Sequence, residues 1–279
     1  MSTWVIVGAS RGIGLEFVRQ LVDQGEYVYA TVRDIAKASV LWSLAGAAPR
    51  ANCQLLEVDV SSETSIVRFV KDIVASKNIH RIDSLVICAG ILEYPNRAND
   101  LYVYPVFFVE FWLCVLSPFS SFEAYSKHLT TNAVGPIITA QKLIKTRIPI
   151  GTITFMSSDS GSMTNFREFE DGFAAYASSK AALNSMIRHM AEELKREKIY
   201  TTVLAIHPGE VQTYAILQKH SPFVMLTTSS DMANISVGWE VEGIISAEES
   251  VTGMLRVIKS KNFAETGSFW TWEGKPHPW

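Results

Sequence analysis

The sequence predicts an α/β fold in which helices cover both faces of a parallel sheet. Short, continuous apolar runs recur along the 279 residues, and such runs are typical of strands that are buried on both sides. Segments with apolar residues at helical spacing follow most of these runs, so strands and helices alternate. Because no repeat and no linker-like composition interrupts the alternation, we expect a single doubly wound domain of the Rossmann type over residues 1–279.

The expected strands are short apolar runs that end at glycine, at polar residues or at a turn. In chain order they are Thr3–Val7, Tyr27–Val32, Gln54–Val58, Ser84–Cys88, Thr152–Met156, Thr201–Ile206 and Gly267–Trp272. The expected helices instead carry apolar residues three and four positions apart, as Ile13, Phe17 and Leu21 do after the first strand. These helices are Gly12–Gln24, Ile35–Leu44, Thr64–Ser76, Ala174–Glu197 and Glu248–Lys259, and Ser61 is expected to cap the third of them.

Composition and charge exclude several classes of protein. The chain is 48% hydrophobic and 19% charged, which argues against disorder over most of its length. Its net charge of −3 provides no basic excess for a phosphate backbone, so we expect no nucleic-acid partner. The six histidines form no HxH or HExxH pattern, so we expect no metal site. Three widely spaced cysteines without a CxxC pair, and an N-terminus without a basic signal-peptide start, favour a reducing, cytoplasmic location.

One apolar segment, residues 100–122, does not fit the alternating pattern. Leu101–Phe122 contains eight aromatic residues and a single charge, Glu110. Its length approaches that of a membrane span, but Glu110, Pro105 and Pro118 count against that interpretation. Two other interpretations stay open: an inserted lid or oligomer contact, and a stretch that is absent from the mature protein, such as retained non-coding sequence.

A glycine-rich turn joins the first expected strand to the first helix. It reads Gly8-Ala9-Ser10-Arg11-Gly12-Ile13-Gly14, a GxxxGxG pattern. Glycine tolerates positive φ and lets the backbone approach a pyrophosphate, while a helix N-terminus offers unpaired N–H groups to its negative charge. Such a turn can also merely connect two elements. Its position between strand and helix at the start of a βαβ series nevertheless favours dinucleotide binding by Gly8, Ser10, Arg11, Gly12, Ile13 and Gly14.

The charge after the second strand indicates which dinucleotide is preferred. NAD-binding sites usually place an acidic residue there for the ribose 2′-hydroxyl, whereas this chain has Arg33. Together with Arg11 in the glycine turn, Arg33 suits the 2′-phosphate of NADP(H). The alternative for Arg33 is a solvated strand end that pairs with Asp34. Asp59, after the third strand, is expected to bind the adenine amino group, or else only to begin a helix.

Tyr176 and Lys180 form a YxxxK pair near the start of a long helix. Their spacing places both side chains on one helical face. A nearby ammonium, together with the positive nicotinamide of an oxidised cofactor, favours the phenolate form. We therefore expect the tyrosine pKa to be lowered and the phenol to act as a general acid or base. Ser158, which follows the fifth expected strand, is positioned to hold a carbonyl oxygen or to cap a helix. Asn132 is expected to hold the lysine through a water, or to be an ordinary polar residue inside a helix.

Taken together, these motifs resemble the short-chain dehydrogenase/reductase family. They are GASRGIG, Asp59-Val60, Cys88-Ala89-Gly90, Asn132, Ser158, Tyr176/Lys180 and His207-Pro208-Gly209, and the C-terminal TGSFWTWEGKPHPW resembles the branch of C-factor and sniffer-type carbonyl reductases. The resemblance implies about seven parallel strands, a proton relay of Asn132, Ser158, Tyr176 and Lys180, and cofactor contacts from Val60, Ala89, Gly90, Val211 and Thr213. It also implies a homodimer or homotetramer.

The chain departs from the family pattern in three places. Ile87-Cys88-Ala89-Gly90 replaces the usual Asn-Asn-Ala-Gly, the loop between Ser158 and Tyr176 is long, and the apolar segment precedes the helix that carries Asn132.

The function that follows is hydride transfer between NADP(H) and a small carbonyl or alcohol substrate. Tyr214–Glu242 is the expected substrate-binding lid, and its Phe223, Met225 and Trp239 suit an apolar substrate. The alternative is a dinucleotide-binding sensor or partner protein with weak or no catalysis.

Overall fold

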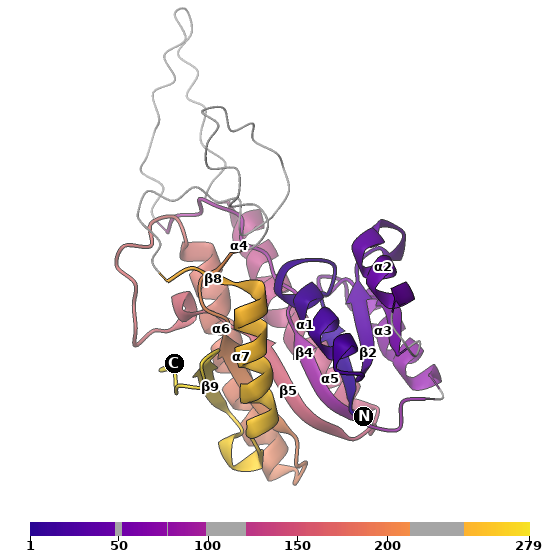
Figure 1. Cartoon of the computed structure of the whole chain (residues 1–279). Coiled ribbons are helices and arrows are strands. Elements are labelled where there is room, and N and C mark those ends of the chain that lie inside the picture. Colours follow the sequence, from indigo (N-terminus) through magenta and orange to yellow (C-terminus); the bar gives the residue numbers. More distant parts are fainter. Residues whose placement is uncertain (48–51, 77, 99–120, 213–242) are drawn as a thin grey trace, which may run out of the picture.

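A parallel sheet of seven strands forms the centre of the structure (Figure 1). The structure is a computed structural model, and it describes residues 1–47, 52–76, 78–98, 121–212 and 243–279. The strands are β1 (Thr3–Val7), β2 (Tyr27–Val32), β3 (Cys53–Glu57), β4 (Ile82–Ile87), β5 (Ile150–Met156), β6 (Thr202–His207) and β9 (Ser268–Thr271). They are ordered β3-β2-β1-β4-β5-β6-β9, and every neighbouring pair is parallel. The predicted doubly wound Rossmann-type fold is confirmed.

Helices cover both faces of the sheet because successive side chains along a strand point to opposite faces. In β1, Val5 and Val7 belong to one apolar cluster, whereas Trp4 and Ile6 belong to the other. The first cluster includes residues of α3 (Glu63–Ala75), α5 (Gly135–Lys145) and α6 (Ala174–Arg196), and the second includes residues of α1 (Gly12–Asp23), α2 (Ser39–Ala47) and α7 (Ala247–Ser260). Figure 1 shows α1 and α7 side by side on their face of the sheet.

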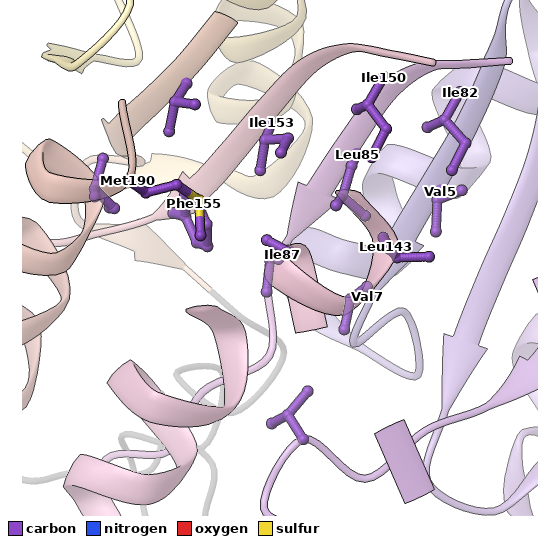
Figure 2. Packing of buried hydrophobic residues seen from close by; sticks show 14 of the residues in the cluster. Val5, Val7, Ile82, Leu85, Ile87, Leu143, Ile150, Ile153, Phe155 and Met190 are labelled. Atoms are coloured by element: carbon purple, nitrogen blue, oxygen red, sulfur yellow. The ribbon is translucent and has the colours of Figure 1, made fainter. Parts of the chain in front are cut away.

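The cluster on the α3–α5–α6 face extends to the carboxyl ends of the central strands (Figure 2). Ile87 of β4 and Phe155 of β5 are register partners, and both are buried. Leu143 of α5 and Met190 of α6 belong to the same cluster. Burying such a side chain contributes about 1.5–3 kcal/mol, so the core holds in place the residues that immediately follow β4 and β5.

A helical stretch with a π-helical centre carries Asn132. It consists of α4 (Phe122–Leu129), a π-helical segment (Thr130–Val134) and α5. Pro136 has no N–H group and cannot donate the α-helical hydrogen bond to the Asn132 carbonyl four residues earlier. At Gly135 an added Cβ would lie 2.1 Å from the Val60 carbonyl oxygen. This close approach brings the helix against the chain that follows β3.

Two predicted details are wrong, and local hydrogen bonds explain both. The Ser62 hydroxyl, not that of Ser61, caps α3 by accepting a hydrogen bond from the Ser65 N–H, because the Ser61 hydroxyl donates to Asp59 instead. The expected helix over 35–44 is divided into a 3₁₀ turn (Ile35–Lys37) and α2. The Asp34 carboxylate accepts from the Ala36 N–H and starts that separate turn.

Several predictions concern residues outside the described part of the chain. The apolar segment 100–122 falls there except for its last two residues, and the proposed lid 214–242 does so entirely. On either side of residues 213–242, β7 (Val211–Gln212) and β8 (Ile245–Ser246) form a short parallel pair. Within the described ranges, no helix combines the length and the apolar character that crossing a membrane requires.

Candidate active site

The glycine turn lies where the strand order reverses, between β1 and β4. In doubly wound sheets, the carboxyl ends of the strands at this point form the crevice in which ligands bind. Gly8 has φ +88°, and a Cβ added there would lie 2.7 Å from the backbone nitrogen of Ala89. A Cβ added at Gly14 would lie 2.1 Å from the Gly8 carbonyl oxygen. Both positions therefore require glycine, and the turn brings β1, β4 and α1 into close contact.

The first turn of α1 has the properties of an anion site. No side chain makes an N-cap hydrogen bond at Arg11, and no acidic residue occupies this first turn. The N–H groups and the positive end of the helix dipole thus face the glycine turn with no carboxylate in the first turn of α1. Ser10 and Arg11 are exposed at this edge. These features fit a dinucleotide pyrophosphate.

At the end of β2, Arg33 is exposed and its neighbour Asp34 is engaged elsewhere. Asp34 forms an ion pair with Lys37 at 3.1 Å, which differs from the alternative in which Asp34 pairs with Arg33. The backbone of β2 also supports the glycine turn, since the Ala9 N–H donates to the Thr31 carbonyl at 2.8 Å. The second strand therefore ends beside the turn with an arginine exposed to solvent.

Asp59 and Val60 form the tight connection between β3 and α3. Asp59 Oδ1 accepts hydrogen bonds from the Ser61 N–H at 2.9 Å and from the Ser61 hydroxyl at 2.6 Å. Asp59 thus orders the turn that precedes the Ser62 cap of α3, and adenine binding by Asp59 stays a prediction. The Val60 side chain is buried in the apolar cluster.

Ser158, Tyr176 and Lys180 meet beside the carboxyl ends of β4 and β5. Tyr176 and Lys180 are both buried, and Lys180 Nζ lies 5.6 Å from the centroid of the Tyr176 ring. Lys180 Nζ donates to the Met156 carbonyl oxygen at 2.8 Å, which fixes the ammonium at the end of β5. Ser158 Oγ accepts from the Ser160 N–H at 3.2 Å and interacts with the Tyr176 hydroxyl. Ser158 is therefore a helix cap and also a neighbour of the phenol.

Burial shifts the pKa values of both Tyr176 and Lys180 in the protein by itself. Burial raises the pKa of the Tyr176 phenol above its usual range, while a hydrogen bond with Ser158 acts in the opposite direction. Burial lowers the pKa of Lys180 to about 8. In the protein by itself, desolvation of the phenolate outweighs the neighbouring groups. The predicted lowering of the Tyr176 pKa, which also needs the positive charge of an oxidised nicotinamide, stays a prediction. The raised pKa keeps the phenol protonated at neutral pH.

Contacts through β4 connect the glycine turn to the tyrosine–lysine pair. Ala89, which Gly8 approaches closely, follows Cys88, and the Ala89 N–H donates to the Val7 carbonyl at 3.0 Å. The Cys88 thiol and the Lys180 ammonium are close enough to perturb one another, although burial is the main cause that raises the pKa of Cys88 to about 12. The predicted phosphate turn and Tyr176 thus lie at the same edge of the sheet, beside the ends of β1, β4 and β5.

Asn132 acts as a structural bridge in the described structure. Its Oδ1 accepts from the Ile91 N–H at 2.7 Å, and its Nδ2 donates to the Ile91 carbonyl at 2.8 Å and to Ser179 Oγ at 3.0 Å. The side chain therefore ties the chain after β4 to α6. Its predicted role in a water relay to Lys180 stays a prediction.

The remaining predicted cofactor contacts are placed only in part. Gly90 follows Ala89 at the end of β4, and Val211 lies in β7, paired with Ile245 of β8. Thr213 is outside the described residues.

Sequence reasoning missed several residues that hold the site together. His128 Nε2 accepts from the Glu93 N–H at 3.1 Å, and its Nδ1 faces the Ala124 carbonyl at 2.8 Å, so the ring supports the segment after β4. Asn184 accepts from the Ser157 hydroxyl at 2.5 Å. Arg167, in the long loop before Tyr176, contacts three carboxylates. None of these residues belongs to a recognisable motif, and each has a partner at least 27 positions away in the sequence.

Comparisons with known proteins agree with this geometry. A family model described as "short chain dehydrogenase" matches residues 2–221. An uncharacterized oxidoreductase of Schizosaccharomyces pombe is 29% identical over 274 residues, covering 97% of this chain and 95% of that protein. The NADPH-bound carbonyl reductase from chicken fatty liver has a TM-score of 0.75 and 26% identity, with 100% of this chain and 99% of that chain covered. The carbonyl reductase Sniffer of D. melanogaster, at 22% identity with the same coverage and a TM-score of 0.73, shows a likeness of fold.

Proposed function

This chain belongs to the short-chain dehydrogenase family, and on that premise we propose that it reduces carbonyl compounds, or oxidises the corresponding alcohols, with NADP(H). Family membership was predicted from the sequence motifs and is confirmed, and it makes the chain an oxidoreductase. One observation carries the finer proposal: a buried tyrosine, a buried lysine and a serine hydroxyl meet beside the glycine turn. When bound, the nicotinamide supplies or accepts the hydride.

Each side chain has a distinct task in reduction. The protonated Tyr176 phenol donates its proton to the substrate oxygen, on which negative charge develops as the carbonyl is reduced. Ser158 Oγ stabilises the same oxygen by a hydrogen bond. Lys180, held by the Met156 carbonyl, keeps a positive charge near the phenolate that remains on Tyr176. In alcohol oxidation the same groups act in reverse, and the phenolate accepts the proton.

The preference for NADP(H) rests on the two arginines at the glycine turn and at the end of β2. Both Arg11 and Arg33 are exposed at this edge of the sheet, and Asp34, the acidic neighbour of Arg33, already pairs with Lys37. Guanidinium groups bind phosphate through paired hydrogen bonds. The NADPH held by the chicken carbonyl reductase supports the same preference.

An apolar or aromatic substrate is the class that the surroundings of Tyr176 favour. The Phe173 ring meets the Tyr176 ring edge-on with centroids 6.2 Å apart, and Tyr94 lies 5.4 Å from Phe173. Ile91 and Leu92, which precede Tyr94 in the segment after β4, are also buried. Aromatic and aliphatic walls with a few polar groups are typical of small-molecule sites.

Replacing Tyr176 by phenylalanine tests the proposal. We expect the Tyr176→Phe variant to bind NADPH as the wild type does and to lose turnover by about 10²–10⁴-fold, because the general acid is gone while the ring remains. The assay follows NADPH oxidation with a panel of aldehydes, ketones and quinones. Tyr29→Phe is the matched control, since Tyr29 is a buried tyrosine of β2. Comparable turnover in Tyr176→Phe would contradict the assigned role, and tight NADPH binding without turnover in the wild type would favour a sensor or partner protein.

A further inference from the structure

Arg167 is the centre of an ionic cluster beside the proposed catalytic group. Its Nη1 contacts Asp159 and lies 2.8 Å from Glu210 Oε1, and its Nε lies 3.1 Å from Glu170 Oε1. The Arg167 side chain is 20% exposed, and that of Glu170 is 10% exposed. At such burial, ionic contacts are screened less than on an open surface, and three carboxylates with one guanidinium leave the cluster net negative.

The cluster joins three segments that meet at the crevice. Asp159 directly follows Ser158, whose hydroxyl donates to Asp159 Oδ1 at 3.3 Å. Glu170 lies in the loop that leads into α6, and its Oε1 also accepts from the Ser160 hydroxyl at 3.0 Å. Glu210 directly precedes β7, and its carbonyl accepts from the Ile245 N–H at 2.9 Å. Arg167 is thus the common partner of the serine turn, the loop before Tyr176, and the segment over which cofactor contacts are expected.

We propose that Arg167 is a positioning residue that clamps the Ser158 turn to the Glu210–Gln212 segment and balances the carboxylates beside the Tyr176 phenol. The inference rests on the proposed function, because it assigns Arg167 a role at that same site. Arginine suits this task better than lysine, since its planar fork donates to several carboxylates at once, whereas an ammonium is a compact charge.

Charged groups on four segments act on or lie near Tyr176. Lys180 lies one turn further along α6, and Asp159, Glu170 and Glu210 each disfavour the phenolate electrostatically and so raise the pKa of Tyr176, in addition to its burial. His207, at the end of β6, accepts a hydrogen bond from the Asp159 N–H at 3.3 Å. Burial lowers the pKa of His207, so its ring is uncharged at neutral pH. Removing the positive charge of Arg167 leaves the carboxylates uncompensated.

The test uses the full-length protein with four variants: Arg167→Gln, Arg167→Lys, Glu210→Gln and, as the matched control, Asp171→Asn. Asp171 anchors the same loop through a two-pronged ion pair with Arg97, at 2.7–3.0 Å, and it does not contact Arg167 in the described structure. The readouts are the dissociation constant of NADPH, measured without turnover, and the pH profile of alcohol oxidation by NADP.

Clamping and charge balance predict different patterns. Both Arg167→Gln and Glu210→Gln should weaken NADPH binding about tenfold or more, since each releases the same segment. The midpoint of the oxidation profile should rise by about one pH unit in Arg167→Gln and fall in Glu210→Gln, because one loses a positive and the other a negative charge. Arg167→Lys should keep the wild-type midpoint with weakened NADPH binding, and Asp171→Asn should match the wild type in both measurements.

Two outcomes would overturn the inference. One is wild-type NADPH binding in Arg167→Gln, and the other is a shift of both midpoints in the same direction, as general loosening of the loop would produce. The proposed function is checked separately, by turnover of NADPH in the wild type and its loss in Tyr176→Phe. If that check holds, either of the two outcomes would refute the role of Arg167 and leave the proposed function intact.

Discussion

The replacement of Gly8 by alanine tests the close approach between the glycine turn and β4. Gly8 has φ +88°, and an added Cβ would meet two backbone atoms of the chain that follows β4, Ala89 N at 2.7 Å and Ala89 Cα at 2.8 Å. Neither atom can move without displacing the chain after β4. Gly25 provides a matched control, since it has φ +77° and nothing lies within 4 Å of its added Cβ.

The expected losses follow from these two geometries. A left-handed backbone costs a non-glycine residue about 1–2 kcal/mol, and both variants incur this cost. Overpacking adds about 1–3 kcal/mol in Gly8→Ala alone. We therefore expect the free energy of unfolding to fall by about 2–5 kcal/mol in Gly8→Ala and by about 1–2 kcal/mol in Gly25→Ala.

Urea unfolding measures both values, provided that the m-value is unchanged and the two-state extrapolation holds. NADPH binding is measured on the same samples, because displacement of Ala89 also alters the crevice. Equal losses of stability in Gly8→Ala and Gly25→Ala would refute the close approach. Unchanged NADPH affinity in a Gly8→Ala protein that is destabilised as expected would instead refute the assignment of the turn to the cofactor site.

Three further predictions test the cofactor preference, a helix cap and a buried charge. Arg33→Asp combined with Arg11→Ala should move the ratio of kcat/KM for NADPH and NADH toward NADH. An unchanged ratio would mean that other residues bind the 2′-phosphate. Ser62→Ala should lower the free energy of unfolding by about 1 kcal/mol through loss of the α3 cap, and an equal loss in Ser61→Ala would contradict that assignment. Burial lowers the pKa of Lys180 to about 8 from 10.5, so between these values the unfolded chain binds more protons and stability rises with pH. The free energy of unfolding of the wild type, relative to that of Lys180→Met, should therefore rise as the pH increases through this window. A constant difference between the two proteins would mean that the lysine is not desolvated.

Much of the site was predictable because its residues belong to local patterns. The glycine turn follows directly from three glycines between a strand and a helix, and the pairing of Tyr176 with Lys180 follows from helical spacing. The carboxyl ends of parallel strands lie at one edge, so residues after β1, β4 and β5 were expected together. Contacts such as Arg167 with Glu210, or His128 with Glu93, join loops whose separation in sequence carries no periodic signal.

The direction of the Tyr176 pKa shows the same limit. Sequence spacing reveals the nearby lysine, but it does not reveal how completely the fold excludes water from the phenol. Desolvation and the three carboxylates brought in by the loop and by Glu210 act in the same direction. The pKa therefore depends on groups that only tertiary packing places around the ring.

The sequence by itself determined the alternation of strands and helices, the glycine turn and the pairing of Tyr176 with Lys180 on one helical face, because each follows from local periodicity or from short-range stereochemistry. Tertiary structure decided the strand order, the contact of Gly8 with Ala89, the bridging role of Asn132 and the ionic cluster at Arg167. These depend on the burial and the electrostatics of residues far apart in the chain, and burial is a property of the whole packed fold rather than of any segment.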